Sequence, residues 1–289
     1  MKREEGSVEN DTLPVGTLFI VATPIGNLED ITLRALRVLR GVDWIAAEDT
    51  RRARKLLTFY GISKRVFGLY GGVERERAPA LVKRLAEGER GALVSEAGTP
   101  GASDPGAALV AAAAAAGVRV TPVPGASAVA AAASAAGIPA SRFAFEGFLP
   151  RKGKERRERI EGFRDDRRAA IFFESPLRVR RTLGEIYRVA GDRRIAIFRE
   201  MTKFHEEITY TDLASAAGGA VSLPEKGEYT IVMEGSRRRT AEKTTFDLEE
   251  FVRVLRGHGM SARDAAAIAS RLTGVPKKDA YASALKFQT

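Results

Sequence analysis

The feature that most constrains the fold is an alternation of short apolar runs with segments whose apolar residues recur at helical spacing. Thr17–Pro24 (TLFIVATP) and Val42–Thr50 (VDWIAAEDT) predict buried strands, and Leu28–Arg40 between them predicts a helix. Thr50 is placed to cap the basic helix that follows it. The alternation continues to Ala136 with short connections. Such an order predicts a parallel sheet covered by helices on both faces.

The second half of the chain has a different order of elements. Phe143–Pro150 (FAFEGFLP) is interpreted as a segment that crosses from the first half into the second. Strands are predicted in AAIFFES, RIAIFRE, EEITYTD and GEYTIVMEG, and some of them follow one another without an intervening helix. Adjacent strands of this kind predict a mixed sheet with antiparallel pairs.

The predicted domain organisation follows these shifts in pattern. It consists of a disordered tail over 1–16, an N-terminal α/β domain over 17–142, a second α/β domain over 143–235, a basic linker over 236–246 and a helical tail over 247–289. The last two predicted helices of the tail are joined by Thr-Gly-Val, which resembles a helix-turn-helix connection. A small packing appendage is the alternative interpretation.

Composition excludes several classes of site. The 289 residues include no cysteine, which excludes disulfides, thiolate metal sites and a cysteine nucleophile. The two histidines, His205 and His258, lie far apart in sequence, so we expect no metal centre. No window approaches eighteen apolar residues and the first residues are polar, so we expect neither a membrane span nor a signal peptide. A cytoplasmic location is the resulting expectation.

The formal net charge of +10 is concentrated in two segments. Residues 151–168 hold nine basic and five acidic side chains, and residues 236–289 hold eleven basic and six acidic ones. Concentrated positive charge is typical of proteins that bind polyanions. The alternative is a solvated surface of ion-paired helices, which is the usual meaning of runs of mixed sign.

Glycine-containing turns follow three of the predicted strands. They are Thr23–Asn27 (TPIGN), Ser95–Gly106 (SEAGTPGASDPG) and Val123–Ser127 (VPGAS). In open α/β sheets ligands bind outside the carboxyl ends of the strands, so three such turns indicate a cleft where backbone approaches a ligand closely. For Asp104 the alternative is a helix N-cap followed by proline. The chain has no GxxxxGK[ST], GxGxxG after a strand, or GxSxG motif, which disfavours those nucleotide and hydrolase sites.

Charged residues also gather at the ends of apolar strands in the second half. Glu174 follows the two phenylalanines of FFES, and Glu200 and Lys203 follow IAIF. Charges at such positions are costly unless they are paired or used, so these three are candidate site residues. For Glu206 and Glu207 a solvated ion-pair cluster is an equally good interpretation.

Together these motifs resemble one family, ribosomal RNA small subunit methyltransferase I, within the tetrapyrrole-methylase-like class of S-adenosylmethionine enzymes. The resemblance covers Thr17–Gly235 with little interruption and the helical tail more loosely. The motifs that carry it are FIVATPIGNLEDIT, IAAEDTR, VSEAGTPGASDPG, VPGASA, FEGFLPRKGKERR, FFESPLR and REMTKFHEE. TPIGN, AEDTR and RExTK in this order separate the chain from the branches that act on cobalamin and siroheme precursors.

The resemblance implies two α/β domains with S-adenosylmethionine in the cleft between them. It also implies a homodimer that methylates the ribose 2′-oxygen of a cytidine in the decoding region of 16S rRNA, with the small ribosomal subunit as partner. The residues that match the motifs of the cofactor site are Pro24, Ala97, Gly98, Thr99, Asp104, Ser127, Ala128, Glu174, Glu200, Thr202 and Thr230.

Three departures from the family pattern stand out. Glu96 replaces the usual aspartate of VSDAGTP, and Leu177 replaces a common histidine. Gly72-Val73-Glu74 replaces a polar His-Asn-Glu stretch and keeps only its glutamate.

The chemistry implied is in-line displacement, in which positioning of the 2′-oxygen dominates. Glu200 or Glu174 is the candidate base, and Lys203 the candidate group that orients the ribose or a phosphate. Two other functions remain open: a methyltransferase acting on a tetrapyrrole precursor, and a non-catalytic RNA-binding module on the same fold. The basic segments disfavour a small planar carboxylate as substrate.

Overall fold

A computed structural model describes residues 13–101, 104–237 and 247–287. The chain divides into two compact units, Met1–Ser236 and Arg237–Thr289. Residues 1–12 of the expected tail, 238–246 of the expected basic linker and the last two residues lie outside the described ranges. No helix in those ranges has the length and apolar character that a membrane crossing needs.

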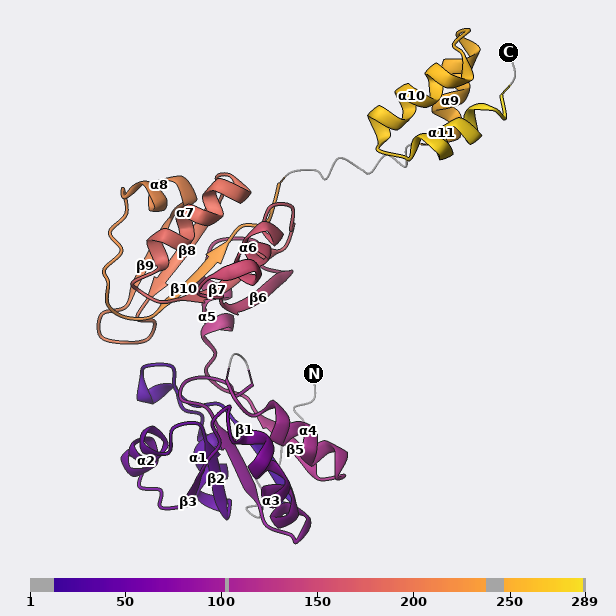
Figure 1. Ribbon diagram of the computed structural model, residues 1–289. Coiled ribbons are helices and arrows are strands. Elements are labelled where there is room, and N and C mark those ends of the chain that lie inside the picture. The colour runs from indigo at the N-terminus through magenta and orange to yellow at the C-terminus, as the bar shows by residue number, and fades with distance from the viewer. Residues whose placement is uncertain (1–12, 102–103, 238–246, 288–289) are drawn as a thin grey trace, which may run out of the picture. The chain divides into compact units, whose positions relative to one another are not determined.

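The first half of the first unit is a parallel sheet, as the alternation predicts (Figure 1). The strand order is β3-β2-β4-β1-β5, and every neighbouring pair is parallel. The strands are β1 (Thr17–Val21), β2 (Trp44–Ala47), β3 (Arg65–Gly68), β4 (Gly91–Val94) and β5 (Arg119–Val123). Because all five run the same way, the turns after β1, β4 and β5 meet at one edge of the sheet.

Helices cover both faces of this sheet. Helices α1 (Leu33–Gly41) and α2 (Thr50–Phe59) pack on the face that carries Phe19. Helices α3 (Glu74–Ala86) and α4 (Ala107–Ala115) pack on the opposite face, which carries Leu18. Neighbouring strand residues therefore bury their side chains in two separate cores, which explains why the strands are apolar runs without alternation.

The start of α2 differs from the prediction by one residue. The N-cap is Asp49, whose Oδ1 accepts hydrogen bonds from the backbone N–H groups of Arg51 at 2.7 Å and Arg52 at 3.2 Å. Thr50 is the first residue of the helix instead. Likewise the predicted Leu28–Arg40 helix is divided into a 3₁₀ turn at Leu28–Asp30 and α1, because the side chain of Thr32 caps α1.

The N-terminus of α4 is capped from elsewhere in the chain. The expectation that Asp104 caps this helix is wrong, because the N-cap is Gly106 and makes no side-chain bond. Glu74, at the start of α3, supplies the acceptor instead. Its Oε1 accepts from the N–H groups of Gly106, Ala108 and Leu109 at 3.1, 2.6 and 3.2 Å. A buried carboxylate thereby satisfies three of the donors that a helix start leaves free.

The second sheet is mixed, as predicted, with the order β6-β7-β10-β8-β9. Strands β6 and β7 are parallel, and the other neighbouring pairs are antiparallel. The strands are β6 (Phe143–Phe148), β7 (Ala169–Glu174), β8 (Arg194–Arg199), β9 (Glu207–Asp212) and β10 (Tyr229–Met233). Most of the segment interpreted as a crossing is therefore an edge strand, because Phe143–Phe148 pairs with β7.

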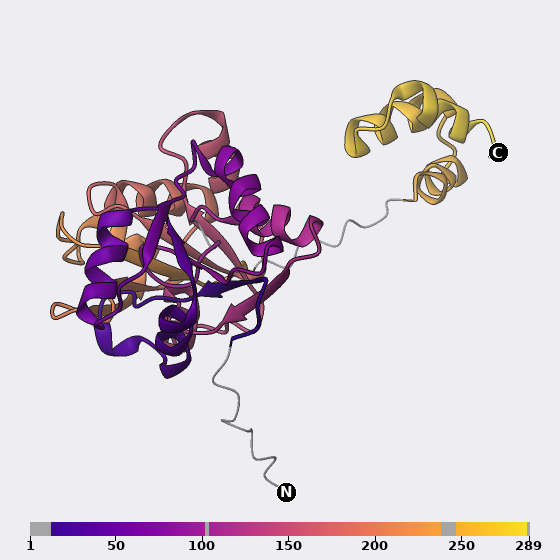
Figure 2. The same cartoon turned by 90° about the horizontal axis from the view of Figure 1, so that it is seen from below.

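Helices α6 (Gly153–Gly162), α7 (Val179–Ala190) and α8 (Leu213–Gly218) cover one face of the second sheet. Helix α5 (Ala128–Ala135) covers the other face, where Ala132 packs with Ile171 and Phe198. Since α5 joins the core of the second sheet, we propose a domain boundary just before it rather than at residue 142. In the view from below, the indigo and purple elements of the first sheet lie nearer the viewer than the orange ones (Figure 2).

The second unit consists of α9 (Leu248–Gly257), α10 (Ala262–Thr273) and α11 (Lys277–Ala284). Its core is made mostly of alanines packed around Val252. Ser261 caps α10, and Gly274 ends it in a left-handed conformation. The short connection Gly274–Pro276 then leads into α11. The small alanine side chains of the core allow the three short helices to pack closely.

Candidate active site

The turns after β1 and β4 are joined by backbone hydrogen bonds. Thr23 N–H donates to the Gly98 carbonyl at 2.9 Å, and Gly98 N–H donates to the Thr23 carbonyl at 3.0 Å. Gly98 has φ +82°, and a Cβ there would lie 3.2 Å from Ile25 Cγ2. Glycine is therefore required for this close approach of two loops.

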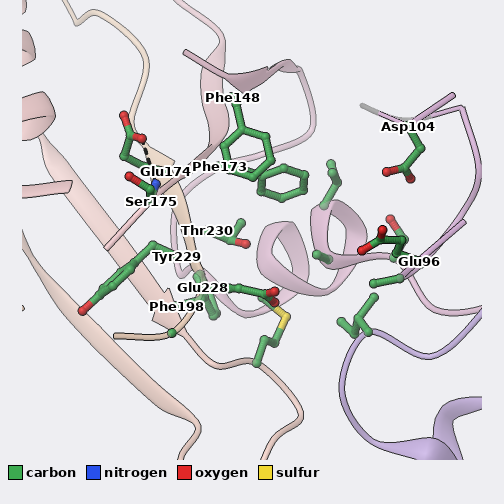
Figure 3. A pocket seen from close by; sticks show the side chains of 18 of the residues that line it. Glu96, Asp104, Phe148, Phe173, Glu174, Ser175, Phe198, Glu228, Tyr229 and Thr230 are labelled. Carbon is green, nitrogen blue, oxygen red and sulfur yellow. Dashed lines mark hydrogen bonds between the residues drawn. The ribbon is translucent and has the colours of Figure 1, made fainter. Parts of the chain in front are cut away.

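A cavity of about 390 Å³ lies between these turns and the edge of the second sheet (Figure 3). The first half of the chain contributes polar and backbone groups, among them the side chains of Glu96 and Asp104. The second half contributes an aromatic wall that includes Phe148 and Phe173. The volume is in the usual range of small-molecule sites, ~300–1,000 Å³.

The cavity brings most of the predicted cofactor residues together. Those that line it are Ala97, Gly98, Thr99, Asp104, Ser127, Ala128, Glu174 and Thr230. Pro24 and Lys203 line a second cavity, which shares lining residues with the first. Within the described part of the chain, Glu200 and Thr202 line neither of these two cavities.

Three carboxylates gather at the first-half wall. Burial, together with repulsion from Glu48 and Glu96, raises the pKa of Asp104 to about 6, although a hydrogen bond with Ser95 opposes the shift. Burial, with repulsion from Glu96 and Asp49, also raises the pKa of Glu48. The site therefore concentrates negative potential where a cationic ligand would be stabilised.

Asp104→Asn is expected to raise the midpoint of thermal unfolding above pH 6 and to leave it nearly unchanged below pH 4. The pKa of Asp104 rises from 3.8 to about 6 on folding, so the native state holds a proton that the unfolded state has lost. Stability therefore falls as pH rises through this interval, and asparagine removes that loss. Thermal unfolding at pH 3.5 and 7.5 measures the difference, with the exposed Asp165→Asn as control. An equal gain at both pH values would contradict the assignment.

Glu174 is enclosed by partners. Its Oε1 accepts a hydrogen bond from the backbone N–H of Ser175 at 2.8 Å and forms an ion pair with Arg178 Nη2 at 2.5 Å. Its Oε2 accepts from Thr182 Oγ1 at 2.7 Å and lies 4.0 Å from Arg156 Nη1. The residue is 1% exposed. With both oxygens occupied, Glu174 is suited to hold the end of β7 in place rather than to accept a proton from a substrate.

Glu200 and Lys203 form a clamp with Glu228. Lys203 Nζ donates to Glu200 Oε1 at 2.9 Å and to Glu228 Oε2 at 3.0 Å. The hydrogen bond from Lys203 lowers the pKa of Glu200. Burial alone would lower the pKa of Lys203, but its bonds to both glutamates outweigh burial and raise it. The pair is thus fixed as an anion and a cation at neutral pH.

The backbone of this loop is strained. Glu200 and Thr202 have φ of +52° and +65°, which non-glycine residues seldom adopt. Thr202 Oγ1 accepts a hydrogen bond from Asn27 N–H of the TPIGN turn at 2.9 Å. Thr202, predicted as a cofactor residue, thus joins the two halves of the unit. Strain of this kind persists only where surrounding contacts hold it, and it is concentrated at functional sites.

The lining fits a cationic nucleoside such as S-adenosylmethionine. The ring centroids of Phe148 and Phe173 lie 5.5 Å apart, and the two rings offer apolar faces to a base. Carboxylates on the opposite wall complement a sulfonium charge. Among the described residues, no group of three or more His, Asp and Glu side chains is arranged to hold a metal ion.

Sequence reasoning missed two residues that line both cavities, Arg52 and Glu228. Arg52 directly follows the AEDTR motif, which ends at Arg51 and served only to recognise the family. Glu228 follows Gly227, whose φ of +95° marks a special turn just before β10. Glu96, noted as a departure from the family, also lines both cavities, and its Oε2 lies 2.6 Å from Arg52 Nη1.

Comparisons with known proteins agree with this architecture. The family described as Tetrapyrrole (Corrin/Porphyrin) Methylases matches residues 17–217, and the RsmI C-terminal HTH domain matches residues 246–288. The chain is 43% identical over 269 residues to ribosomal RNA small subunit methyltransferase I of Xylella fastidiosa, covering 92% of this chain and 98% of that protein. It is 45% identical over 221 residues to the Thermotoga maritima protein of the same name, covering 76% and 99%.

A solved structure shows the same fold at low identity. It is the uroporphyrin-III C-methyl transferase of Thermus thermophilus complexed with S-adenyl homocysteine, with a TM-score of 0.53 and 18% identity. The match covers 75% of this chain and 96% of that one.

Proposed function

Because this chain belongs to the ribosomal RNA small subunit methyltransferase I family of S-adenosylmethionine-dependent methyltransferases, we propose that it methylates the ribose 2′-oxygen of a cytidine in the decoding region of 16S rRNA. The observation that best supports this is the cavity in which three glycine-containing turns face an aromatic wall. We also propose that the chain acts as a homodimer on the small ribosomal subunit in the cytoplasm, as the resemblance implies.

Residues of the first half would hold the cofactor. The backbone at Ala97–Thr99 and the start of α5 at Ser127–Ala128 lie against the cavity and offer close polar contacts. S-adenosylmethionine bound there would supply an electrophilic methyl group. The ribose 2′-oxygen would take up that methyl group and would lose its hydroxyl proton to a carboxylate of the second half.

Residues of the second half would position the nucleophile. Lys203, fixed as a cation, is placed to orient the ribose or its phosphate. Glu200 holds Lys203, and Glu174 holds the end of β7, so we assign both as positioning residues. We propose that Glu228 accepts the proton of the 2′-hydroxyl. Its side chain is 76% exposed, and one of its carboxylate oxygens accepts a hydrogen bond from Lys203. A base within reach contributes ~10²–10⁴-fold to a transfer of this type.

Lys203→Gln and Glu228→Gln are each expected to lower kcat by about 10²-fold, since each removes a group from the reacting oxygen. Lys226→Gln and Glu225→Gln, exposed side chains of the same loop, are matched controls and should retain turnover. The measurement is transfer of labelled methyl from S-adenosylmethionine to small ribosomal subunits, followed by mapping of the modified nucleotide. Label on a base, or no label on RNA, would contradict the proposed function. Full turnover in both variants would contradict the residue roles alone.

A further inference from the structure

Five of the nine cations in the basic segment 151–168 pair with carboxylates in the folded chain. Four of these cations form ion pairs that remove them from a polyanion-binding surface: Lys154–Glu158, Arg159–Glu146, Arg164–Glu161 and Arg168–Asp166. Arg156 is buried in the network around Glu174. These five cations therefore follow the alternative that the mixed sequence allowed, a set of ion pairs.

Helix α2 carries cations of a different kind. Arg51, Arg54 and Lys55 are exposed, and no carboxylate in the described ranges forms an ion pair with any of them. The apolar face of the helix, with Ala53 and Leu57, is buried against the first sheet. The cations therefore project from a helix that is fixed in place, which is the arrangement that phosphate binding requires.

The second cavity lies against this helix. It has a volume of about 450 Å³ and shares Arg52, Glu96 and Glu228 with the cofactor cavity, so the two are adjacent. One part of its lining is apolar, with Leu28, Leu56 and Phe59. Another part is charged and includes Lys203. Phe59 is 64% exposed, so its ring offers an open apolar surface at this cavity.

We propose that this second cavity binds one nucleotide of a single-stranded RNA segment, with its base against Phe59 and its phosphate at Arg52 and Lys55. The inference rests on the proposed function and names the substrate subsite. An extruded base is recognised by stacking on an aromatic ring, and its backbone by nearby cations. With the base at the apolar part, the ribose lies toward Lys203 and Glu228, beside the cofactor cavity.

Arg52 would exchange its carboxylate partner for an RNA phosphate when RNA binds at this subsite. Its guanidinium lies 2.6 Å from Glu96 Oε2, and the side chain is 66% exposed. An exposed ion pair contributes little to stability, so a phosphate can replace the carboxylate at small cost. The release of Glu96 would then leave its charge facing the cofactor cavity, which it also lines.

The test compares Lys55→Gln and Phe59→Ala with Lys83→Gln on α3 and Tyr187→Ala on α7, which line neither cavity. Dissociation constants and KM are measured with unmethylated small ribosomal subunits over a range of salt concentrations. S-adenosylmethionine affinity is measured by calorimetry. Phe59→Ala should raise the RNA KM about ten-fold through lost stacking. Lys55→Gln should raise it and reduce the slope of log affinity against log salt by about 0.7.

Cofactor affinity should stay within two-fold in all four variants, which also shows that they fold. If the wild-type protein methylates RNA and both test variants match their controls, the inference is overturned while the proposed function stands. If the wild-type protein methylates no RNA, both are overturned.

Discussion

Replacing Glu174 by alanine is expected to lower the free energy of unfolding by about 3–5 kcal/mol. The carboxylate lies between Arg156 and Arg178, in a position where neither it nor Arg156 reaches solvent appreciably. Its removal takes away the acceptor of the Thr182 hydroxyl and the carboxylate paired with Arg178, and it leaves the buried Arg156 with Glu185 as its remaining carboxylate partner. The cost of a buried charge that has lost its partner greatly exceeds that of an exposed one.

Urea unfolding followed by far-ultraviolet circular dichroism measures this loss. Glu158→Ala is the matched control, because Glu158 pairs with Lys154 on the exposed surface of α6 and should change stability by less than ~1 kcal/mol. Glu174→Gln should fall between the two, since the amide keeps an acceptor oxygen but loses the charge. A loss below ~1 kcal/mol for Glu174→Ala would show that the network does not hold the end of β7.

Gly26→Ala is expected to lower the rate of methyl transfer by about 10²-fold while the fold is retained. A Cβ at Gly26 would lie 2.6 Å from Lys203 Cγ, 2.7 Å from Thr202 Oγ1 and 2.9 Å from the Met201 carbonyl oxygen. The loop cannot easily yield, because Glu200 and Thr202 are already in left-handed conformations. The added methyl must therefore move Lys203, and a shift of ~1 Å at a positioning group costs ~10²-fold in rate.

Single-turnover transfer to small ribosomal subunits measures this effect, with S-adenosylmethionine affinity as the companion value. Gly71→Ala is the control, because a Cβ at Gly71 would meet no atom within 4 Å. A Gly26→Ala protein with the wild-type rate would show that the contact between the TPIGN and REMTK loops has no part in placing Lys203.

Local pattern was sufficient for most of the secondary structure and for the cofactor cavity. The strands of the first sheet are continuous apolar runs, and the turns that follow them are rich in glycine, so both signals lie within a few residues. Parallel pairing then brings the turns to one edge. Most of the residues assigned by motif to the first-half wall accordingly line one cavity.

Contacts between distant residues were beyond such reasoning. The cap of α4 comes from Glu74, some thirty residues upstream, and local preference alone pointed to Asp104. The neutralisation of Arg159 depends on Glu146, in a strand that was interpreted as a crossing. Arg52 meets Glu96 only because β2 and β4 are neighbours in the sheet. Each depends on topology, which a single stretch of sequence does not encode.

The two backbone hydrogen bonds between Thr23 and Gly98 form an antiparallel bridge above a parallel sheet, and they tie the two loops that make the cavity floor. Because these loops are already held together, they lose little conformational entropy when a ligand binds. Little of the free energy gained from contacts with the ligand should therefore be offset by ordering of the protein. The conformational entropy lost on binding should come from the RNA strand rather than from these loops. Exchange of the amide hydrogens of these two residues should accordingly be slow before any cofactor is added.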